Sequence, residues 1–170
     1  MIGNTDNKHF LTDDLYRQCI DLLPIVTVDI LIFDKHLKQT LLFRRENDPL
    51  KGIYYSIGGR IYKNENFLNT AIRVCKEEVD LQINKGDLTF GAVTEEIFHN
   101  SIYDGVNAHN VNIFFGYIAP GPLTVQCDEQ HSCCKWFKLN DPNLHPYILQ
   151  KIHLLLPNLG NPDNTDNPDK

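Results

Sequence analysis

Residues 59–81 read GRIYKNENFLNTAIRVCKEEVDL, and this stretch carries the strongest pattern in the chain. Five residues separate Gly59 from Glu65, and seven more separate Glu65 from Arg73. From residue 67 to 79, apolar side chains recur at the i, i+3, i+4, i+7 spacing of an amphipathic helix; they are Leu68, Ala71, Ile72, Cys75 and Val79. The stretch therefore predicts a glycine turn followed by a helix with one buried face.

Two adjacent glutamates, Glu77 and Glu78, follow the arginine on this predicted helix. At about 100° per residue they lie to one side of the apolar stripe, and Val74 lies on that same side, off the stripe. Adjacent carboxylates facing a glycine turn with free carbonyls suit a hard cation such as Mg²⁺. Alone, the Lys-Glu-Glu run is more typical of a solvated helix face. In register with the glycine, glutamate and arginine, it favours a metal-binding function.

Working outward, the remaining sequence predicts strands before and after this helix and a second long helix at the end. Apolar and β-branched runs predict strands at 25–33, 39–45, 52–60, 88–99, 109–119 and 133–139, and helical spacing predicts helices at 11–23 and 143–156. This order predicts an α+β fold, an α/β/α sandwich with a mixed β-sheet between helices. We expect one domain over residues 1–160, with an N-terminal helix within 10–24, and a disordered polar tail at 161–170.

Composition limits the classes of function. The 170 residues are 42% hydrophobic and 22% charged, as in an ordinary globular protein. A net charge of −6 argues against nonspecific binding to nucleic acid or anionic membranes, although a bound cation can still recruit a phosphate ligand. The five cysteines suggest free thiols; residues 1–15 contain no apolar signal core, and no apolar run reaches transmembrane length. We therefore expect a cytoplasmic protein.

A second group of reactive side chains lies in CDEQHSCCKWF, residues 127–137. Asp128, Glu129 and His131 are expected in a loop directly before the last strand, where they could reach a ligand. A histidine there can act as a general base, because its ordinary pKa lies near neutral pH. By itself such a loop is commonplace, and it gains meaning only beside the helix motif.

The helix motif resembles the box of the Nudix hydrolases, G-x5-E-x7-R-E-U-x-E-E-x-G-U, where U is a bulky aliphatic residue. Val74 stands where that box has a glutamate, and Asp80 stands where it has the closing glycine. The chain is similar in particular to the GDP-mannose mannosyl hydrolase branch. That branch has a nonacidic residue after the arginine and a DEQH loop before an aromatic-containing strand, matched here by residues 128–131 and Trp136. The similarity spans roughly residues 10–150.

The resemblance implies Mg²⁺-dependent hydrolysis of GDP-mannose or GDP-glucose to GDP and free sugar, with Mn²⁺ as an alternative cation. Water would attack the anomeric carbon with inversion. His131 would take the proton as general base, so that a glutamate at position 74 becomes dispensable. The resemblance also implies a homodimer with residues 10–23 near the interface, and a nucleotide-sugar substrate rather than a nucleic-acid or membrane partner.

Carried over by motif, the resemblance assigns metal binding to Gly59 through its carbonyl, to Glu78 and to Glu129, with Glu77 as an additional ligand. Arg45 and Arg60 would bind the diphosphate, and Arg44 is an alternative to Arg45 because the register of Phe-Arg-Arg is open. Asp29 would bind substrate, unless it is a strand-edge residue facing solvent. The implied catalytic residues are His131, Arg45, Arg60, His99 and Tyr103, the last two near the sugar and leaving group.

Two other functions are weighed against this one. A conventional Nudix pyrophosphohydrolase would attack phosphorus, but the absence of an acid at position 74 argues against it. A nucleotide-binding protein without turnover would not need to retain the carboxylates of Glu77, Glu78 and Glu129. The released products distinguish all three, because cleavage at the sugar carbon gives GDP and free sugar, and cleavage at phosphorus gives GMP and sugar phosphate.

Overall fold

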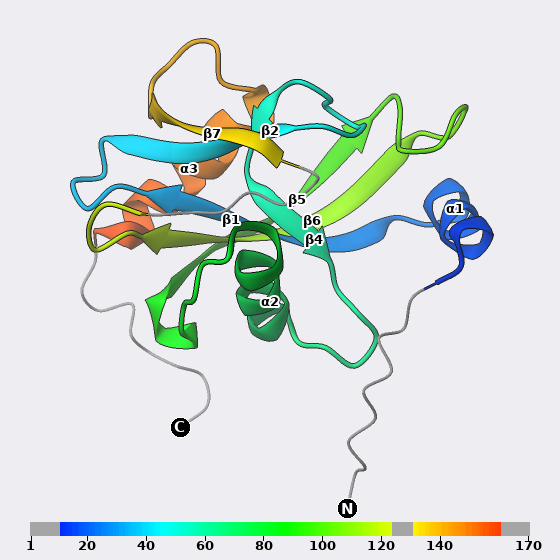
Figure 1. Ribbon diagram of the computed structural model, residues 1–170, viewed down its shortest axis with the longest axis horizontal. Helices are drawn as coiled ribbons and strands as arrows, with labels where there is room; N and C mark the ends of the chain where they lie inside the picture. The colour runs from blue at the N-terminus through cyan, green and yellow to red at the C-terminus, as the bar shows by residue number, and fades with distance from the viewer. Residues whose placement is uncertain (1–10, 124–130, 161–170) are drawn as a thin grey trace, which may run out of the picture.

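The structure, a computed structural model, describes residues 11–123 and 131–160 (Figure 1). Its elements in chain order are α1 (Asp13–Leu22), β1 (Ile25–Phe33), β2 (Gln39–Arg45), β3 (Tyr54–Tyr55), β4 (Ile57–Arg60), α2 (Phe67–Val79), the 3₁₀ turn η1 (Lys85–Asp87), β5 (Leu88–Phe98), β6 (Ala108–Ile118), β7 (His131–Lys138) and α3 (Pro146–Leu159). No helix in these ranges combines the length and the apolar character needed to span a membrane.

The strands of the described residues form one mixed sheet with the order β3-β2-β1-β6-β5, while β4 also pairs with β1 and β7 with β2. β1 and β6 run parallel, and the other pairs are antiparallel. α2 and α3 cover opposite faces of this sheet, and α1 lies to one side (Figure 1). The predicted sandwich with a mixed sheet between helices is confirmed.

The central strand β1 is buried on both faces, as its nearly continuous apolar sequence requires. Val28, Ile30 and Ile32 belong to the core beneath α2, and Leu31 and Phe33 belong to the core beneath α3. Each such side chain contributes about 1.5–3 kcal/mol when fully buried. β1 therefore packs against both helices and fixes the position of the polar residues in its first half.

Helix α2 has the predicted bounds and turns the predicted side chains inward. Ala71 and Cys75 are fully buried against the sheet, and Leu68 and Ile72 pack against the same core. Asp80, which stands in place of a closing glycine, ends the helix in the left-handed conformation with φ 52°. Aspartate is one of the few non-glycine residues that adopt this conformation readily, so the helix ends normally.

The segment 52–60, predicted as one short strand, forms two. β3 pairs with β2, whereas β4 pairs with β1, so the chain crosses from one neighbour to the other at Ser56. The Ser56 hydroxyl donates a 2.7 Å hydrogen bond to Asp29 on β1 at this crossing. β4 consequently brings the glycine turn of the sequence motif alongside the first half of β1.

Candidate active site

A cavity of about 400 Å³ opens beside β4. Its walls come from the first half of β1, from β4, from one side of α2, from the end of β5 and from α1; the lining includes Asp29, Gly59, Arg60, Glu77, Glu78 and Glu96. Because β4 lies between β1 and α2, the glycine turn forms a wall and the helix carboxylates reach the opening. Residues far apart in the sequence thus meet around one concave surface.

Arg73 fastens this part of the molecule together. Its guanidinium donates to the Glu65 carboxylate at 2.8 and 3.0 Å, to Glu77 at 3.1 Å and to the carbonyl of Arg60 at 2.9 Å. Its other face lies 3.9 Å from the centre of the Tyr62 ring. A planar guanidinium can make all these contacts at once, and a lysine cannot. The glutamate–arginine spacing of the motif therefore encodes a clamp between the 60–66 loop and α2.

We expect Glu65→Gln to weaken this clamp at neutral pH but not in acid. Burial alone would raise the pKa of Glu65, but hydrogen bonds from Arg73 and the Tyr62 backbone outweigh burial and lower it. A lowered carboxyl pKa adds stability above the unfolded pKa of about 4.3, and this stability is lost as pH falls through the folded pKa. Urea unfolding should show a loss of about 1–3 kcal/mol at pH 7 that disappears as pH falls through the lowered folded-state pKa of Glu65. An equal loss at both pH values would contradict the electrostatic explanation.

The metal-binding candidates lie on one wall. Glu78 accepts a 3.2 Å hydrogen bond from the Gly58 backbone and lies beside Gly59, whereas Glu77 is bound by Arg73 and its side chain is 46% exposed. Carboxylate and carbonyl oxygens are the donors that Mg²⁺ prefers, so this wall fits a hard cation. In the described part of the chain these residues do not form a group of three or more metal-binding side chains. Glu129, predicted to complete the set, lies outside the described residues.

Val74 departs from the expected arrangement. It is 1% exposed and belongs to the core beneath the sheet, and its Cγ2 would lie 3.0 Å from a Cβ added at Gly59. The expectation that it lies off the buried face is wrong, because β4 packs over that side of α2 and widens the buried arc beyond the apolar stripe. A buried aliphatic side chain at this position cannot accept a proton from water.

Arg45 and Arg60 both line the cavity. Neighbouring strand residues point to opposite faces, so Arg44 lies on the other side of β2, where its side chain is 46% exposed. The guanidinium of Arg60 lies 5.3 Å from the ring centre of Tyr16 and 4.7 Å from that of Tyr62, and cation–π attraction holds it there. Of the two alternatives on β2, Arg45 is the one at the cavity.

The structure places His99 and Tyr103 outside the cavity lining. His99 is exposed just after β5. The Tyr103 hydroxyl donates to the Asp13 carboxylate at 2.9 Å, and its ring packs edge-on against Tyr16 of α1 at 6.3 Å. Tyr103 therefore attaches the 99–107 loop to α1, and the loop presents Ser101 to the cavity instead.

His131 begins strand β7, which starts two residues earlier than the sequence pattern predicts. Its backbone lies opposite Arg45 in the β2–β7 ladder, next to a residue that lines the cavity. The side chain of His131 lies outside the described part of the chain, as do Asp128 and Glu129. The predicted roles of these residues stay predictions.

Asp29 is neither solvent-facing nor at a sheet edge. It is 6% exposed, and its Oδ2 lies 2.6 Å from the ammonium group of Lys151 and accepts the Ser56 hydroxyl. Its Oδ1 accepts the Asn112 amide at 2.9 Å. An ionised aspartate inside an apolar strand requires such partners, and here the counter-ion comes from α3.

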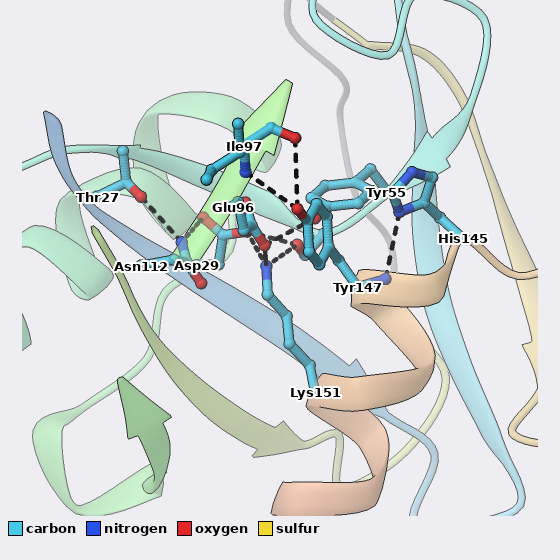
Figure 2. A network of polar contacts seen from close by, with 10 residues as sticks. Thr27, Asp29, Tyr55, Glu96, Ile97, Asn112, His145, Tyr147 and Lys151 are labelled. Atoms are coloured by element: carbon cyan, nitrogen blue, oxygen red, sulfur yellow. Dashed lines mark hydrogen bonds and ion pairs between the residues drawn. The ribbon is translucent and has the colours of Figure 1, made fainter. Parts of the chain in front are cut away.

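The same ammonium binds a second carboxylate. Glu96 is 3% exposed, and its Oε1 lies 2.6 Å from Lys151 Nζ and accepts the Tyr55 hydroxyl at 2.7 Å (Figure 2). Burial lowers the pKa of Lys151, but the two carboxylates outweigh burial and raise it, so the lysine stays charged. Burial and the nearby Glu96 raise the pKa of Tyr55, which stays a hydrogen-bond donor.

Sequence reasoning singled out Asp29 but missed Lys151, Glu96 and Tyr55, although a signal for Lys151 exists. Lys151 continues the buried stripe of α3, whose other members are Ile148, Ile152 and Leu155 at the i, i+3, i+4, i+7 spacing. A lysine on an apolar stripe and an aspartate in an apolar strand each need a buried partner of opposite charge. Considered together, the two would have predicted each other.

Known proteins share this architecture. The NUDIX domain family model matches residues 23–156. The low-salt glycan biosynthesis protein Agl8 of Haloferax volcanii is 30% identical over 147 residues, which cover 85% of this chain and 90% of that protein. The NUDIX domain of Shewanella oneidensis NrtR, complexed with ADP ribose, superposes with a TM-score of 0.64 at 20% identity over 88% of this chain and 99% of that chain.

A MutT/nudix family protein from Enterococcus faecalis superposes with a TM-score of 0.56 at 16% identity, over 76% of this chain and 57% of that chain. Proteins of this family generally use divalent cations such as Mg²⁺ or Mn²⁺. The family model covers more than half of the chain, and it includes the box, β1 and Lys151 of α3. The protein therefore belongs to the Nudix family of hydrolases.

Proposed function

We propose that this protein hydrolyses a nucleotide sugar, GDP-mannose or GDP-glucose, to GDP and free sugar by attack of water at the anomeric carbon with inversion. The observation that carries the proposal is the buried Val74 within an otherwise assembled box. The Arg73 clamp and the Glu78 carboxylate are present at the cavity, yet the residue after the arginine offers no proton acceptor. Proton transfer then falls to a group elsewhere, and His131 is the residue we assign.

The charges around the cavity support a substrate with two chemically different ends. Arg45 and Arg60 supply fixed positive charge, which suits a diphosphate. Asp29 and Glu96, on β1 and β5, supply hydrogen-bond acceptors, which suit hydroxyl or amino groups. A nucleoside diphosphate sugar has both features. The glycan biosynthesis role named for the Haloferax relative agrees with a sugar-containing substrate.

In the proposed reaction, Arg45 and Arg60 hold the diphosphate while His131 takes a proton from the attacking water. The bond between the anomeric carbon and the phosphate oxygen breaks, that oxygen leaves with GDP, and the water oxygen stays on the sugar. A divalent cation held by Glu78, the Gly59 carbonyl and Glu129, with Glu77 as an additional ligand, would neutralise the leaving diphosphate. We also propose a homodimer, on the resemblance alone.

Product identification tests the proposal. The protein is incubated with Mg²⁺ and a panel of nucleoside diphosphate sugars, and the products are separated and identified. GDP and free sugar support the proposal. GMP and sugar phosphate would mean conventional attack at phosphorus, and the absence of turnover with every substrate would mean a binding protein; either result overturns it.

Replacing Glu78 by glutamine tests the cation site. Glutamine keeps the shape and an acceptor for the Gly58 backbone but removes the charge, so the fold should survive. We expect Mn²⁺ affinity, measured by calorimetry, and turnover with Mg²⁺ to fall by about 10²-fold or more, because the leaving diphosphate loses its counter-ion.

Glu77→Gln is the matched comparison, since the neighbouring carboxylate is already bound by Arg73. A smaller loss of Mn²⁺ affinity is expected for that variant. Near-normal metal binding and activity in Glu78→Gln would show that the cation lies elsewhere.

A further inference from the structure

Two carboxylates and one lysine form a charged floor to the cavity, and we call Asp29, Glu96 and Lys151 the floor cluster. Both carboxylates line the cavity, whereas Lys151 is 1% exposed and reaches them from α3 (Figure 2). Each carboxylate has an oxygen 2.6 Å from the same Nζ atom. The lysine therefore holds two acceptor groups, from strands on opposite sides of β6, close to each other.

Core stability alone gives little reason for this cluster. Buried ions lose their hydration, and apolar residues of similar size commonly replace such a group without loss of stability. The cluster is instead located where the apolar core meets the cavity, with β1 changing from Leu31 and Phe33 in the core to Asp29 and Thr27 at the lining. This location indicates a role toward the cavity's contents.

Glu96 lines the cavity and has unused acceptor capacity. The hydrogen bonds from Tyr55 and Lys151 both end on Oε1, and in the described residues no donor reaches Oε2. A carboxylate offers about four lone-pair sites and donates nothing when ionised. Burial raises the pKa of Glu96 and the Lys151 ammonium opposes that rise, while Tyr55 and Lys151 together fix the orientation of the carboxyl group. The result is a rigid acceptor directed at a ligand that carries O–H or N–H donors.

We propose that Glu96 is a specificity-determining residue that accepts hydrogen bonds from hydroxyl groups of the substrate's sugar, and that Lys151 is the positioning residue that orients it beside Asp29. This inference rests on the proposed function. Both oxygens of Asp29 already accept hydrogen bonds, and Oε1 of Glu96 accepts from Tyr55 and Lys151, so among the described residues of the cluster one carboxylate oxygen is available to a ligand. The amide edge of guanine donates from N1 and N2 toward both oxygens of a carboxylate, so a single available oxygen favours a sugar hydroxyl.

The test compares kcat/KM of the unchanged protein and of Glu96→Gln on each of several substrates, in the manner of a double-mutant cycle. The substrates are GDP-mannose, deoxy analogues that each lack one sugar hydroxyl, and IDP-mannose, which lacks the guanine amino group. Glu96→Gln should lower kcat/KM for GDP-mannose by about 10- to 100-fold, as expected for hydrogen bonds to a charged group. Its effect should shrink with one deoxy-sugar and stay unchanged with IDP-mannose, and inhibition by GDP should stay the same.

Glu95→Gln is the matched control, because Glu95 is the adjacent residue on β5 but its side chain is 71% exposed and faces His109. It should leave all the rates unchanged. For Lys151→Met, we expect the same pattern as for Glu96→Gln: a smaller loss of kcat/KM with one deoxy-sugar than with GDP-mannose. A purely structural role would lower kcat/KM equally for every substrate. Since that variant could fail to fold, the Glu96→Gln cycles are decisive alone.

If the effect of Glu96→Gln shrank with IDP-mannose and not with a deoxy-sugar, Glu96 would contact the base. That result would overturn the inference. Equal effects on every substrate would also overturn it. Failure of the proposed function is seen separately, in the wild-type protein, as release of no free sugar from any substrate.

Discussion

His131→Ala should release free sugar from GDP-mannose about 10²–10⁴ times more slowly than the unchanged protein. The expectation follows from the loss of the only base assigned to the attacking water, while the groups assigned to the diphosphate and the cation stay in place. Binding of Mn²⁺ and GDP, measured by calorimetry, should therefore change little. His153→Ala is the matched control, because this histidine is exposed on α3, beside a separate shallow cavity.

The pH profile and an isotope label sharpen this test. The rate of the unchanged protein should rise with pH through the titration of a histidine, since only neutral imidazole accepts a proton, and His131→Ala should lose that limb. In ¹⁸O-water the label should appear on the sugar, whose first-formed anomer is inverted. Label on a phosphate would mean attack at phosphorus, and the role of His131 would be abandoned.

Val74→Glu addresses the same question from the opposite side. It restores the acid of the box, and it should not rescue His131→Ala, because water attacking the sugar carbon is expected away from this position. Val74 is buried beneath Gly59, so an ionised side chain there also meets a desolvation penalty. Recovery of sugar release in the double variant would contradict the assignment of the base.

The sequence predicts the fold well wherever periodicity and chain order suffice. The stripe through Ala71 and Cys75 gives the bounds and the buried side of α2, and the order of strands and helices gives the sandwich. Periodicity gives the wrong burial for Val74. The apolar stripe shows which side chains prefer burial, but it does not show which strand covers the helix. The packing of β4 over α2 is a feature of the tertiary structure, and no local sequence pattern predicts it.

The candidate site is predicted where a motif sets the spacing and missed where side chains meet across the fold. The clamp between Glu65 and Arg73 is local to one motif, and it forms as the spacing suggests. Lys151 and Asp29 are 122 residues apart and meet only because α3 and β1 pack together. Each was recognisable as a charge in an apolar context, but their pairing, and the addition of Glu96, depends on the order of strands in the sheet.

Lys151→Met should lower the free energy of unfolding by about 3–5 kcal/mol at pH 7. Methionine fills a similar volume in α3, so the loss comes from the charge and not from a cavity. Without the ammonium, the carboxylates of Asp29 and Glu96 are buried side by side with no counter-ion. Chemical unfolding monitored by far-ultraviolet circular dichroism measures the change. Lys138→Met is the control, because that lysine is exposed on β7 and should change stability by less than about 0.5 kcal/mol.

The pH dependence identifies the origin of the loss. Burial raises the pKa of Glu96 even with Lys151 beside it, and removal of the lysine raises that pKa further. A carboxyl group with a raised folded pKa gains stability as pH falls through that pKa, because the folded state then binds more protons. The deficit of Lys151→Met should therefore shrink between pH 7 and pH 5. In the unchanged protein, the raised pKa of Lys151 contributes stability that is lost only above about pH 10.4.

Neutralising the carboxylates as well should restore stability without restoring activity. In the triple variant Lys151→Met, Asp29→Asn, Glu96→Gln no buried charge remains, and the amides can still accept from Ser56 and Tyr55. Its free energy of unfolding should exceed that of Lys151→Met, because replacing a whole buried ion cluster costs far less than removing one member. If the cluster served stability alone, this variant would recover sugar release together with its fold. We expect it to fold and to remain impaired, because the acceptors that face the cavity have lost their charge; recovery of full activity would contradict that expectation.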